Sequence, residues 1–435
     1  MTSFLAENIG PLMFVGLVIF LLLGYPVAFA LSAVGLLFGF IGIQLGLLHP
    51  QLLQALPQRV YGIMQNDTLL AIPFFTFMGL VLERSGMAEE LLDTLGQLFG
   101  AVRGGLAYSV IFVGGLLAAT TGVVAASVIA MGLISLPIML RHGYDKRLAT
   151  GVIAASGTLA QIIPPSLVLI VMADQLGKSV GDLYRGALVP GLMLMGMYAG
   201  YALLVSIFRP ASAPALAASA RTLRGWALGR RVLSSLIPPV VLIFLVLGTI
   251  FLGIATPTEG GAMGGCGALA LAALRKRLSL TVLRQAMSVT TKLACFVMFI
   301  LIGSTLFGLV FRGVNGDLWV EHLLTALPGG AFGFLLVVNA MVFVLAFFLD
   351  YFELAFIIVP LLAPVADKLG VDLVWFGVLL SVNMQTSFLH PPFGFALFYL
   401  RSVAPKAVKT SDIYWGAAPF VCIQLLMVGL MIVFP

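Results

Sequence analysis

The apolar segment 148–173 is long enough to cross a bilayer, yet its middle reads ASGTLAQIIPPS (155–166). Proline removes a backbone donor and disfavours the helical conformation of the residue before it. Unpaired backbone groups are costly in hydrocarbon, so such a break needs protein, water or a bound ligand to satisfy the groups that it frees. The sequence therefore predicts a broken helix here rather than an ordinary span.

The composition places the chain in a membrane. Hydrophobic residues make up 61% of the 435 residues, charged residues only 9%, and the mean hydropathy is +1.13. A soluble domain carries about 25% charged residues. The net charge of +6 comes from loop arginines, and no basic stretch interleaved with aromatic residues points to nucleic acid. Cys266, Cys295 and Cys422 all lie in apolar segments, which favours core packing over a disulfide or metal site.

Segments of about 17–25 apolar residues can cross the bilayer as helices. The candidates lie near 10–25, 27–46, 68–83, 148–173, 186–208, 232–252, 257–274, 287–311, 372–400 and 413–434. Two further apolar regions, 104–139 and 331–366, are each interrupted midway, and two arms of about 15 residues are too short to cross. Both regions are predicted to be re-entrant hairpins. Amphipathic stretches at 47–67, 85–103, 278–286 and 312–330 fit helices lying along the membrane surface.

Basic loops fix the orientation, because cytoplasmic loops carry an excess of lysine and arginine. The linker 209–231 holds five arginines and no acidic residue, and the other basic loops are 141–147, 275–277 and 401–409. All four face the cytoplasm if the N-terminus is periplasmic and both long regions are hairpins rather than spans.

Residues 136–166 and 363–393 align without gaps at a constant offset of 227 (363 − 136 = 227). The alignment pairs Pro137 with Pro364, Gly143 with Gly370, Asp145 with Asp372, and Pro164-Pro165 with Pro391-Pro392. Four predicted spans separate the two broken segments, so these run in opposite directions. This is an inverted repeat, which is typical of secondary transporters.

The broken helices and the hairpin tips are predicted to meet near the membrane midplane. Helix ends expose unpaired N–H and C=O groups, and helix N-termini attract carboxylates. Free carbonyls with hydroxyl and amide oxygens would also form an oxygen cage for a small cation. The predicted ligands of such a cation are Gly122, Ser156, Gly157, Thr158, Pro164, Asn383, Met384 and Pro391. The predicted substrate-binding residues are Thr120, Thr121, Asp350, Glu353, Gln385 and Thr386.

Several of these residues have a second interpretation. Small polar residues such as Thr120 and Thr121 also mediate helix packing in membranes. Acidic residues in a membrane are functional by default, but Asp350 and Glu353 could face water at a shallow hairpin tip. His390 could carry a proton or act as a hydrogen-bonded spacer. Glu259, close to the end of a span, could cap its helix or contribute to a site.

The chain resembles the large permease subunit of tripartite ATP-independent periplasmic (TRAP) transporters over nearly its whole length. The stretches that carry the resemblance are IPFFTFMG (72–79), RHGYDKRLATGVIAASGTLAQIIPPS (141–166), ATPTEGGA (255–262) and NMQTSFLHPPFGFALFYLRSVAP (383–405). The resemblance implies sodium-driven uptake of an organic acid by an elevator movement in the bacterial inner membrane. It also implies two partners, a small four-span membrane subunit and a periplasmic substrate-binding protein.

The chain departs from the family pattern at three places. The first hairpin tip has Thr121, Gly122 and Val123, then Ser127, where many members have Ser-Gly-Ser and then Asp. The second tip has DYFE (350–353) in place of Glu-Pro-Thr-Pro, and His390 stands where a threonine is common.

The predicted fold is an all-α, inverted-repeat, ion-transporter-like membrane protein of elevator type, with about ten full spans, two broken helices and two re-entrant hairpins. The predicted regions are scaffold and arm helices (1–103), a first transport region (104–208), a cytoplasmic linker (209–231), a second scaffold (232–330) and a second transport region (331–435).

No enzyme is predicted, because the four histidines lie far apart and neither His-Glu-x-x-His nor Gly-x-Ser-x-Gly occurs. A passive channel would not need twin broken helices with inverted hairpins. No cofactor is expected apart from transported sodium. The alternative function is proton-coupled transport of an organic anion that uses Asp350, Glu353 and His390.

Overall fold

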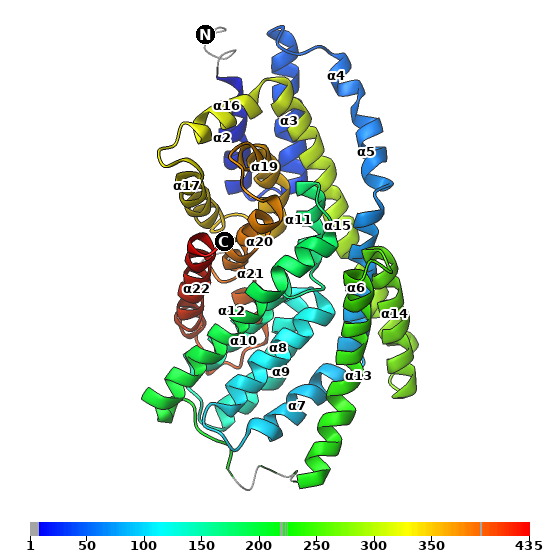
Figure 1. Ribbon diagram of the computed structural model, residues 1–435, viewed down its shortest axis with the longest axis vertical. Helices are drawn as coiled ribbons and strands as arrows, with labels where there is room; N and C mark the ends of the chain where they lie inside the picture. The colour runs from blue at the N-terminus through cyan, green and yellow to red at the C-terminus, as the bar shows by residue number, and fades with distance from the viewer. Residues whose placement is uncertain (1–7, 218–220, 222, 224, 392–393) are drawn as a thin grey trace.

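The structure is a computed structural model that describes residues 8–217, 221, 223, 225–391 and 394–435, with the side chains of 118–121 outside the description. The described chain is helical throughout, and the same order of helices occurs twice (Figure 1). The first half contains α2 (Ile9–Leu22), α3 (Val27–Gln44), α4 (Gln51–Gln54), α5 (Leu56–Met64), α6 (Asp67–Arg84), α7 (Met87–Phe99), α8 (Gly105–Thr121), α9 (Val124–Arg141), α10 (Lys146–Thr158), η1 (Leu159–Gln161), α11 (Leu167–Leu176) and α12 (Val180–Phe208). After η2 (Pro210–Ser212), the second half contains α13 (Gly225–Phe251), α14 (Pro257–Leu274), α15 (Leu280–Gly313), α16 (Gly316–Thr325), α17 (Gly330–Leu345), α18 (Tyr351–Ile357), α19 (Val359–Lys368), α20 (Leu373–Met384), η4 (Gln385–Phe388), α21 (Phe395–Val403) and α22 (Thr410–Val433).

Among the described helices, six are long and apolar enough to cross a membrane, and two bent pairs bring the number to eight. The chain is therefore a multi-pass membrane protein. Both broken helices are confirmed: α10 and α11 are separated by η1 and the double proline, and α20 and α21 by η4 and the second double proline. About ten full spans were predicted, whereas the length and composition of the described helices support six to eight.

Both interrupted regions fold back toward the side from which they start. At the first, the backbone N–H of Leu106 at the start of α8 donates to Tyr144 Oη, just beyond the end of α9, at 3.2 Å. At the second, Lys368 at the end of α19 forms an ion pair with Glu321 of α16, which precedes α17. Figure 1 shows α8 and α9 in the lower half of the molecule and α17 and α19 in the upper half. The hairpin prediction therefore agrees with the structure.

The residues that recur at the offset of 227 start the broken helices. Asp145 caps α10 by accepting hydrogen bonds from two backbone N–H groups, and Asp372 caps α20 in the same way from Trp375. Gly143 and Gly370 adopt φ values of +80° and +74°, which side chains other than glycine rarely allow. The repeat thus encodes the same turn and cap twice.

Small residues let the outer spans pack closely. A Cβ atom at Gly264 of α14 would lie 2.5 Å from Met78 Sδ of α6, and one at Gly303 of α15 would lie 2.5 Å from the Ala28 carbonyl oxygen of α3. Close packing of backbones through glycine is a common source of helix association in membranes. The pairs α6–α14 and α3–α15 are equivalent in the repeat, and each joins one helix of the first half to one helix of the second, so the same packing occurs twice between the halves.

Two expectations were wrong. Residues 278–286 do not form a separate surface arm, because α15 begins at Leu280 and continues without a break for 34 residues. The three cysteines are exposed on helix surfaces rather than packed in the core. Apolar composition alone cannot distinguish a buried helix face from one that faces lipid. Glu259, in contrast, forms a capping box with Thr256, as one of its two interpretations predicted.

The amphipathic helix α7 is attached to α13 and α14 through Glu90. Its carboxylate accepts hydrogen bonds from Ser235 Oγ at 2.7 Å and from Arg275 at 2.8 Å, and Arg277 lies 3.4 Å away. Partial burial opposes ionisation, but these three partners together lower the pKa of Glu90 below its usual value.

We expect Glu90→Gln to lower the melting temperature by about 2 °C near neutral pH, because it removes the charge that the two arginines face. A lowered pKa contributes stability above the unfolded-state value of about 4.5 and loses it as the pH falls through the folded-state value. The difference between the variant and the original protein should therefore shrink in acid. Thermal unfolding at several pH values measures it, and a difference that grows below pH ~4.5 would contradict the assignment.

Candidate functional site

The two broken helices meet where each of them unwinds. Gln385 donates a hydrogen bond from its side-chain amide to the carbonyl oxygen of Thr158. These two residues are equivalent in the repeat, since 158 + 227 = 385, so the contact lies close to the axis that relates the halves. Gln424 of α22 donates to Thr158 Oγ1 at 3.4 Å and to Tyr198 Oη at 2.9 Å. The polar groups freed by unwinding are thus gathered in one buried region.

Ser156 precedes the first break and is fully buried. Its Oγ has no hydrogen-bond partner among the described residues. A Cβ atom at Gly114 of α8 would lie 2.5 Å from Ser156 Cβ, and one at Gly157 would lie 2.3 Å from Val128 of α9. Both hairpin helices therefore pack directly against this part of α10. A buried hydroxyl without a partner costs stability, so such a group needs an explanation.

Asn383 is the equivalent of Ser156 in the second half, since 156 + 227 = 383. It donates hydrogen bonds to the carbonyl oxygen and the Oδ1 of Asn339, on α17, at 2.8 and 2.9 Å. Its own Oδ1 is buried without a partner in the described part of the chain, as is Gln385 Oε1. Each half thus provides a buried side-chain oxygen that is free to accept a donor or bind a cation.

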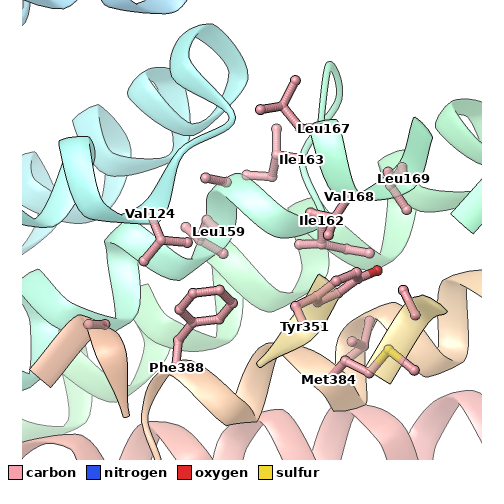
Figure 2. Close-up of a cluster of buried hydrophobic side chains, with 14 of the residues drawn as sticks. Val124, Leu159, Ile162, Ile163, Leu167, Val168, Leu169, Tyr351, Met384 and Phe388 are labelled. Atoms are coloured by element: carbon pink, nitrogen blue, oxygen red, sulfur yellow. The ribbon is translucent and has the colours of Figure 1, made fainter. Parts of the chain in front are cut away.

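Apolar side chains surround this polar region. Figure 2 shows Leu159 of the first break beside Phe388 and Ile162 beside Tyr351, with Ile163 farther away next to Leu167. Tyr351 is fully buried and donates from Oη to Ser381 Oγ at 2.6 Å. The unwound backbone is therefore enclosed by protein, as irregular structure in a membrane requires.

A cavity of about 470 Å³ lies between the hairpin tips and the span α15. Gly122 at the first tip, with φ of +58°, and Gln161 of η1 line one side, together with α18 and α21. Residues of α15 line the other side. The volume is within the range of about 300–1,000 Å³ that is common for small-molecule sites.

Asp350 and Glu353 line this cavity and also cap α18. Asp350 Oδ1 accepts from the Glu353 backbone at 2.8 Å, and Glu353 Oε2 accepts from the Asp350 backbone at 2.8 Å. This reciprocal arrangement is a capping box, so both carboxylates have a structural role at the hairpin tip. His390 is buried and its ring lies 4.5 and 4.1 Å from the rings of Phe343 and Phe347, between centroids.

A family model described as "Tripartite ATP-independent periplasmic transporter, DctM component" matches residues 14–435. The chain belongs to this family. As a TRAP large permease subunit, it is part of a transporter that works with a periplasmic binding protein.

Individual relatives agree with this assignment. A C4-dicarboxylate TRAP transporter large permease protein DctM from Pseudomonas aeruginosa is 32% identical over 360 residues, which cover 82% of each chain. An isethionate TRAP transporter permease protein DctMQ from Oleidesulfovibrio alaskensis is 27% identical and matches 93% of this chain but 62% of its own length. Among solved structures, the YdaH transporter of Alcanivorax borkumensis has a TM-score of 0.65, covers 89% of this chain and 90% of its own, and is 15% identical. This last likeness shows a shared fold alone.

The structure of this TRAP permease places the predicted site residues in three groups. The cavity is lined by Gly122, Asp350 and Glu353. The buried crossing of the broken helices contains Ser156, Gly157, Thr158, Asn383, Met384, Gln385 and Thr386. Pro164 lines a separate apolar cavity between α8, α12 and α13, and Pro391 lies in the turn after η4. The side chains of Thr120 and Thr121 lie outside the described residues, as does Pro392.

Gln385 and Thr386 are not among the described residues that line the cavity at the hairpin tips. Gln385 contacts Thr158, and Thr386 donates to the carbonyl oxygen of Asn383 at 2.7 Å. Their assignment to substrate stays a prediction, and their positions are closer to the predicted sodium ligands.

Asn339, Gln161 and Lys292 are site residues that were not predicted from the sequence. Asn339 is a polar residue in the apolar run that became α17, and Lys292 is a charged residue inside the predicted span 287–311. Polar and charged residues in spans are functional by default, so the signal was present for both. What the sequence lacked was the contact that joins each of them to the site.

Proposed function

We propose that this TRAP permease subunit couples the uptake of an organic acid to sodium and moves its site across the membrane as an elevator. The observation that carries the proposal is the set of buried oxygens at the two breaks: Ser156 Oγ, Asn383 Oδ1 and Gln385 Oε1 lack partners among the described residues. Small hard cations are held by oxygen ligands of this kind, including hydroxyl, amide and backbone carbonyl oxygens. The unwound segments supply such carbonyls next to these side chains.

The proton-coupled alternative receives less support from the same region. Asp350 and Glu353 are engaged in the capping box, and His390 is not among the described residues that line their cavity. A proton route needs groups within hydrogen-bonding reach of one another. No hydrogen bond between His390 and either carboxylate occurs in the described part of the chain.

The proposed moving body consists of the two transport regions, 104–208 and 331–435. The proposed scaffold, which stays fixed, consists of 1–103 and 232–330. Within the moving body, α10 packs against α8, α9 and α22, so hairpin and broken helix form one unit. The proposed partners are the periplasmic binding protein and a small membrane subunit. The relative named DctMQ is longer than this chain, which leaves room for such a second subunit within one polypeptide.

The test is uptake into vesicles that hold this chain with its small subunit, with the binding protein outside. The tracer is an organic acid chosen by a ligand screen on that binding protein. Uptake should follow an inward sodium gradient, collapse when an ionophore dissipates it, and fall to background when either partner is left out. Uptake driven by a proton gradient in sodium-free buffer would instead support the alternative, and full uptake by this chain alone would refute the partner assignment.

A further inference from the structure

One wall of the cavity at the hairpin tips belongs to the scaffold helix α15 and carries a lysine. Lys292 lies on α15, inside the predicted span 287–311, and its side chain lines the cavity beside Val289 and Phe296. It is the one cation among the described residues that line this cavity. No ion pair or hydrogen bond joins Lys292 to another described residue. A lysine within a span is expensive unless a partner meets its charge.

The two carboxylates across the cavity do not serve as that partner. Asp350 and Glu353 each accept a backbone N–H of the other, and no ion pair connects either of them to Lys292 within the described residues. Lys292 is an exposed residue on the wall of a space that is large enough for a small molecule, and its charge is unpaired among the described residues.

The rest of the cavity is rich in aromatic side chains. Phe296 of α15 and Phe352 of α18 approach with ring centroids 6.1 Å apart, nearly perpendicular. Phe388, Phe395 and Tyr399 contribute three more rings from the second broken helix. Such rings favour a planar or apolar ligand body.

We propose that this cavity selects a monocarboxylate with an aromatic body, whose carboxylate pairs with Lys292 and whose ring packs among the phenylalanines. A dicarboxylate fits poorly, because its second charge would face aromatic rings or the carboxylates of Asp350 and Glu353. This assignment differs from the C4-dicarboxylates in the name of the Pseudomonas aeruginosa relative. It rests on the proposed transport function for its site, but it does not depend on the coupling ion.

The test is equilibrium binding to the purified chain in lipid nanodiscs at constant high sodium. Phenylacetate should bind at least about tenfold more tightly than succinate, the size expected for one well-placed charge-assisted hydrogen bond. Phenylacetamide, which has the same shape without the charge, should also bind at least about tenfold more weakly than phenylacetate. This comparison needs no variant, so misfolding cannot confuse it.

Variants test whether the positive charge of Lys292 is the group that binds the carboxylate. Lys292→Gln should weaken phenylacetate binding by about tenfold or more, and Lys292→Arg should retain most of the affinity. Arg284→Gln, which removes a cation from an earlier turn of the same helix, should leave binding unchanged because Arg284 is not among the described cavity residues. Equal or tighter binding of succinate, no binding of phenylacetate, or unchanged binding by Lys292→Gln would each overturn the assignment.

Repeating the titration in choline buffer separates this inference from the proposed function. If phenylacetate binds equally well without sodium and remains sensitive to Lys292, the substrate assignment stands and sodium coupling fails. If binding depends on sodium but not on Lys292, the substrate assignment fails while sodium coupling stands.

Discussion

Replacing Ser156 by alanine is expected to stabilise the sodium-free protein and to reduce the further stabilisation that sodium provides. The Ser156 hydroxyl is fully buried without a partner among the described residues, so its removal relieves a desolvation cost of about 1 kcal/mol or more. If this oxygen binds sodium, the same change removes a ligand. The sodium concentration for half-maximal uptake should then rise by about tenfold or more, and uptake at ordinary sodium should fall sharply.

The size of the substituted residue matters at this position. Ser156 Cβ would lie 2.5 Å from a Cβ atom placed at Gly114, so a larger side chain would push the hairpin helix α8 away. A loss of transport in Ser156→Leu could therefore reflect packing alone. Alanine adds no volume and removes only the oxygen, which distinguishes a ligand role from a packing role.

The measurement is thermal unfolding in detergent at increasing sodium, with choline keeping the ionic strength constant. A ligand that binds only the folded protein raises its stability in proportion to the logarithm of concentration above the dissociation constant. Ser109→Ala is a suitable control, because Ser109 is also buried but donates to the carbonyl oxygens of Leu95 and Gly105 at 2.8 and 2.9 Å. The control should keep the sodium response. An undiminished response in Ser156→Ala would remove Ser156 from the ion site.

The sequence was sufficient for those parts of the fold that depend on local chemistry. A double proline interrupts the helix at the two positions that the offset of 227 relates, whereas Pro238-Pro239 lie inside the unbroken α13, so the repeat is what marks the breaks. The aspartates and glycines that recur at the same offset start the helices that precede these breaks. The inverted order of helices then follows from counting spans between two such breaks. The breaks, the hairpins and the repeat could all be predicted from the sequence for this reason.

Contacts between segments that are distant along the chain could not be predicted from the sequence. The pairing of Asn339 with Asn383 joins residues 44 apart, and Lys292 reaches the cavity from a span that the repeat assigns to the scaffold. Hydropathy treats both residues as isolated polar positions in apolar runs. The continuity of α15 from Leu280 through residue 286 was not predicted, because an amphipathic helix start resembles a separate surface helix. The structure has one helix that Ser279 caps and that propagates from there without a break.

Among the hydrogen bonds that join the proposed moving body to the proposed scaffold, two involve the scaffold helices α6 and α15, and the elevator movement must break both. Asn66, the N-cap of α6, donates to Asp174 Oδ1 of α11 at 2.5 Å, and Ser304 of α15 donates to the Phe356 carbonyl oxygen of α18 at 2.6 Å. Each half of the repeat provides one such bond. A gate confined to the hairpin tips would leave the contact between α6 and α11 intact.

Cysteines at Asn66 and Asp174, joined by a short bifunctional thiosulfonate, should therefore reduce uptake to background, and a reductant that cleaves the crosslink should restore it. Both positions are partly exposed, so the reagent can reach them. The background is a variant with Cys266, Cys295 and Cys422 replaced by serine, because all three are exposed and would react.

Arg84 and Gln285 form the matched control pair, since they lie on α6 and α15, both within the proposed scaffold, and their side chains are 3.5 Å apart. A crosslink there should leave uptake unchanged. If the crosslink between positions 66 and 174 forms fully and uptake continues at its normal rate, α11 does not move past α6, and transport in this protein proceeds by a local gate rather than an elevator.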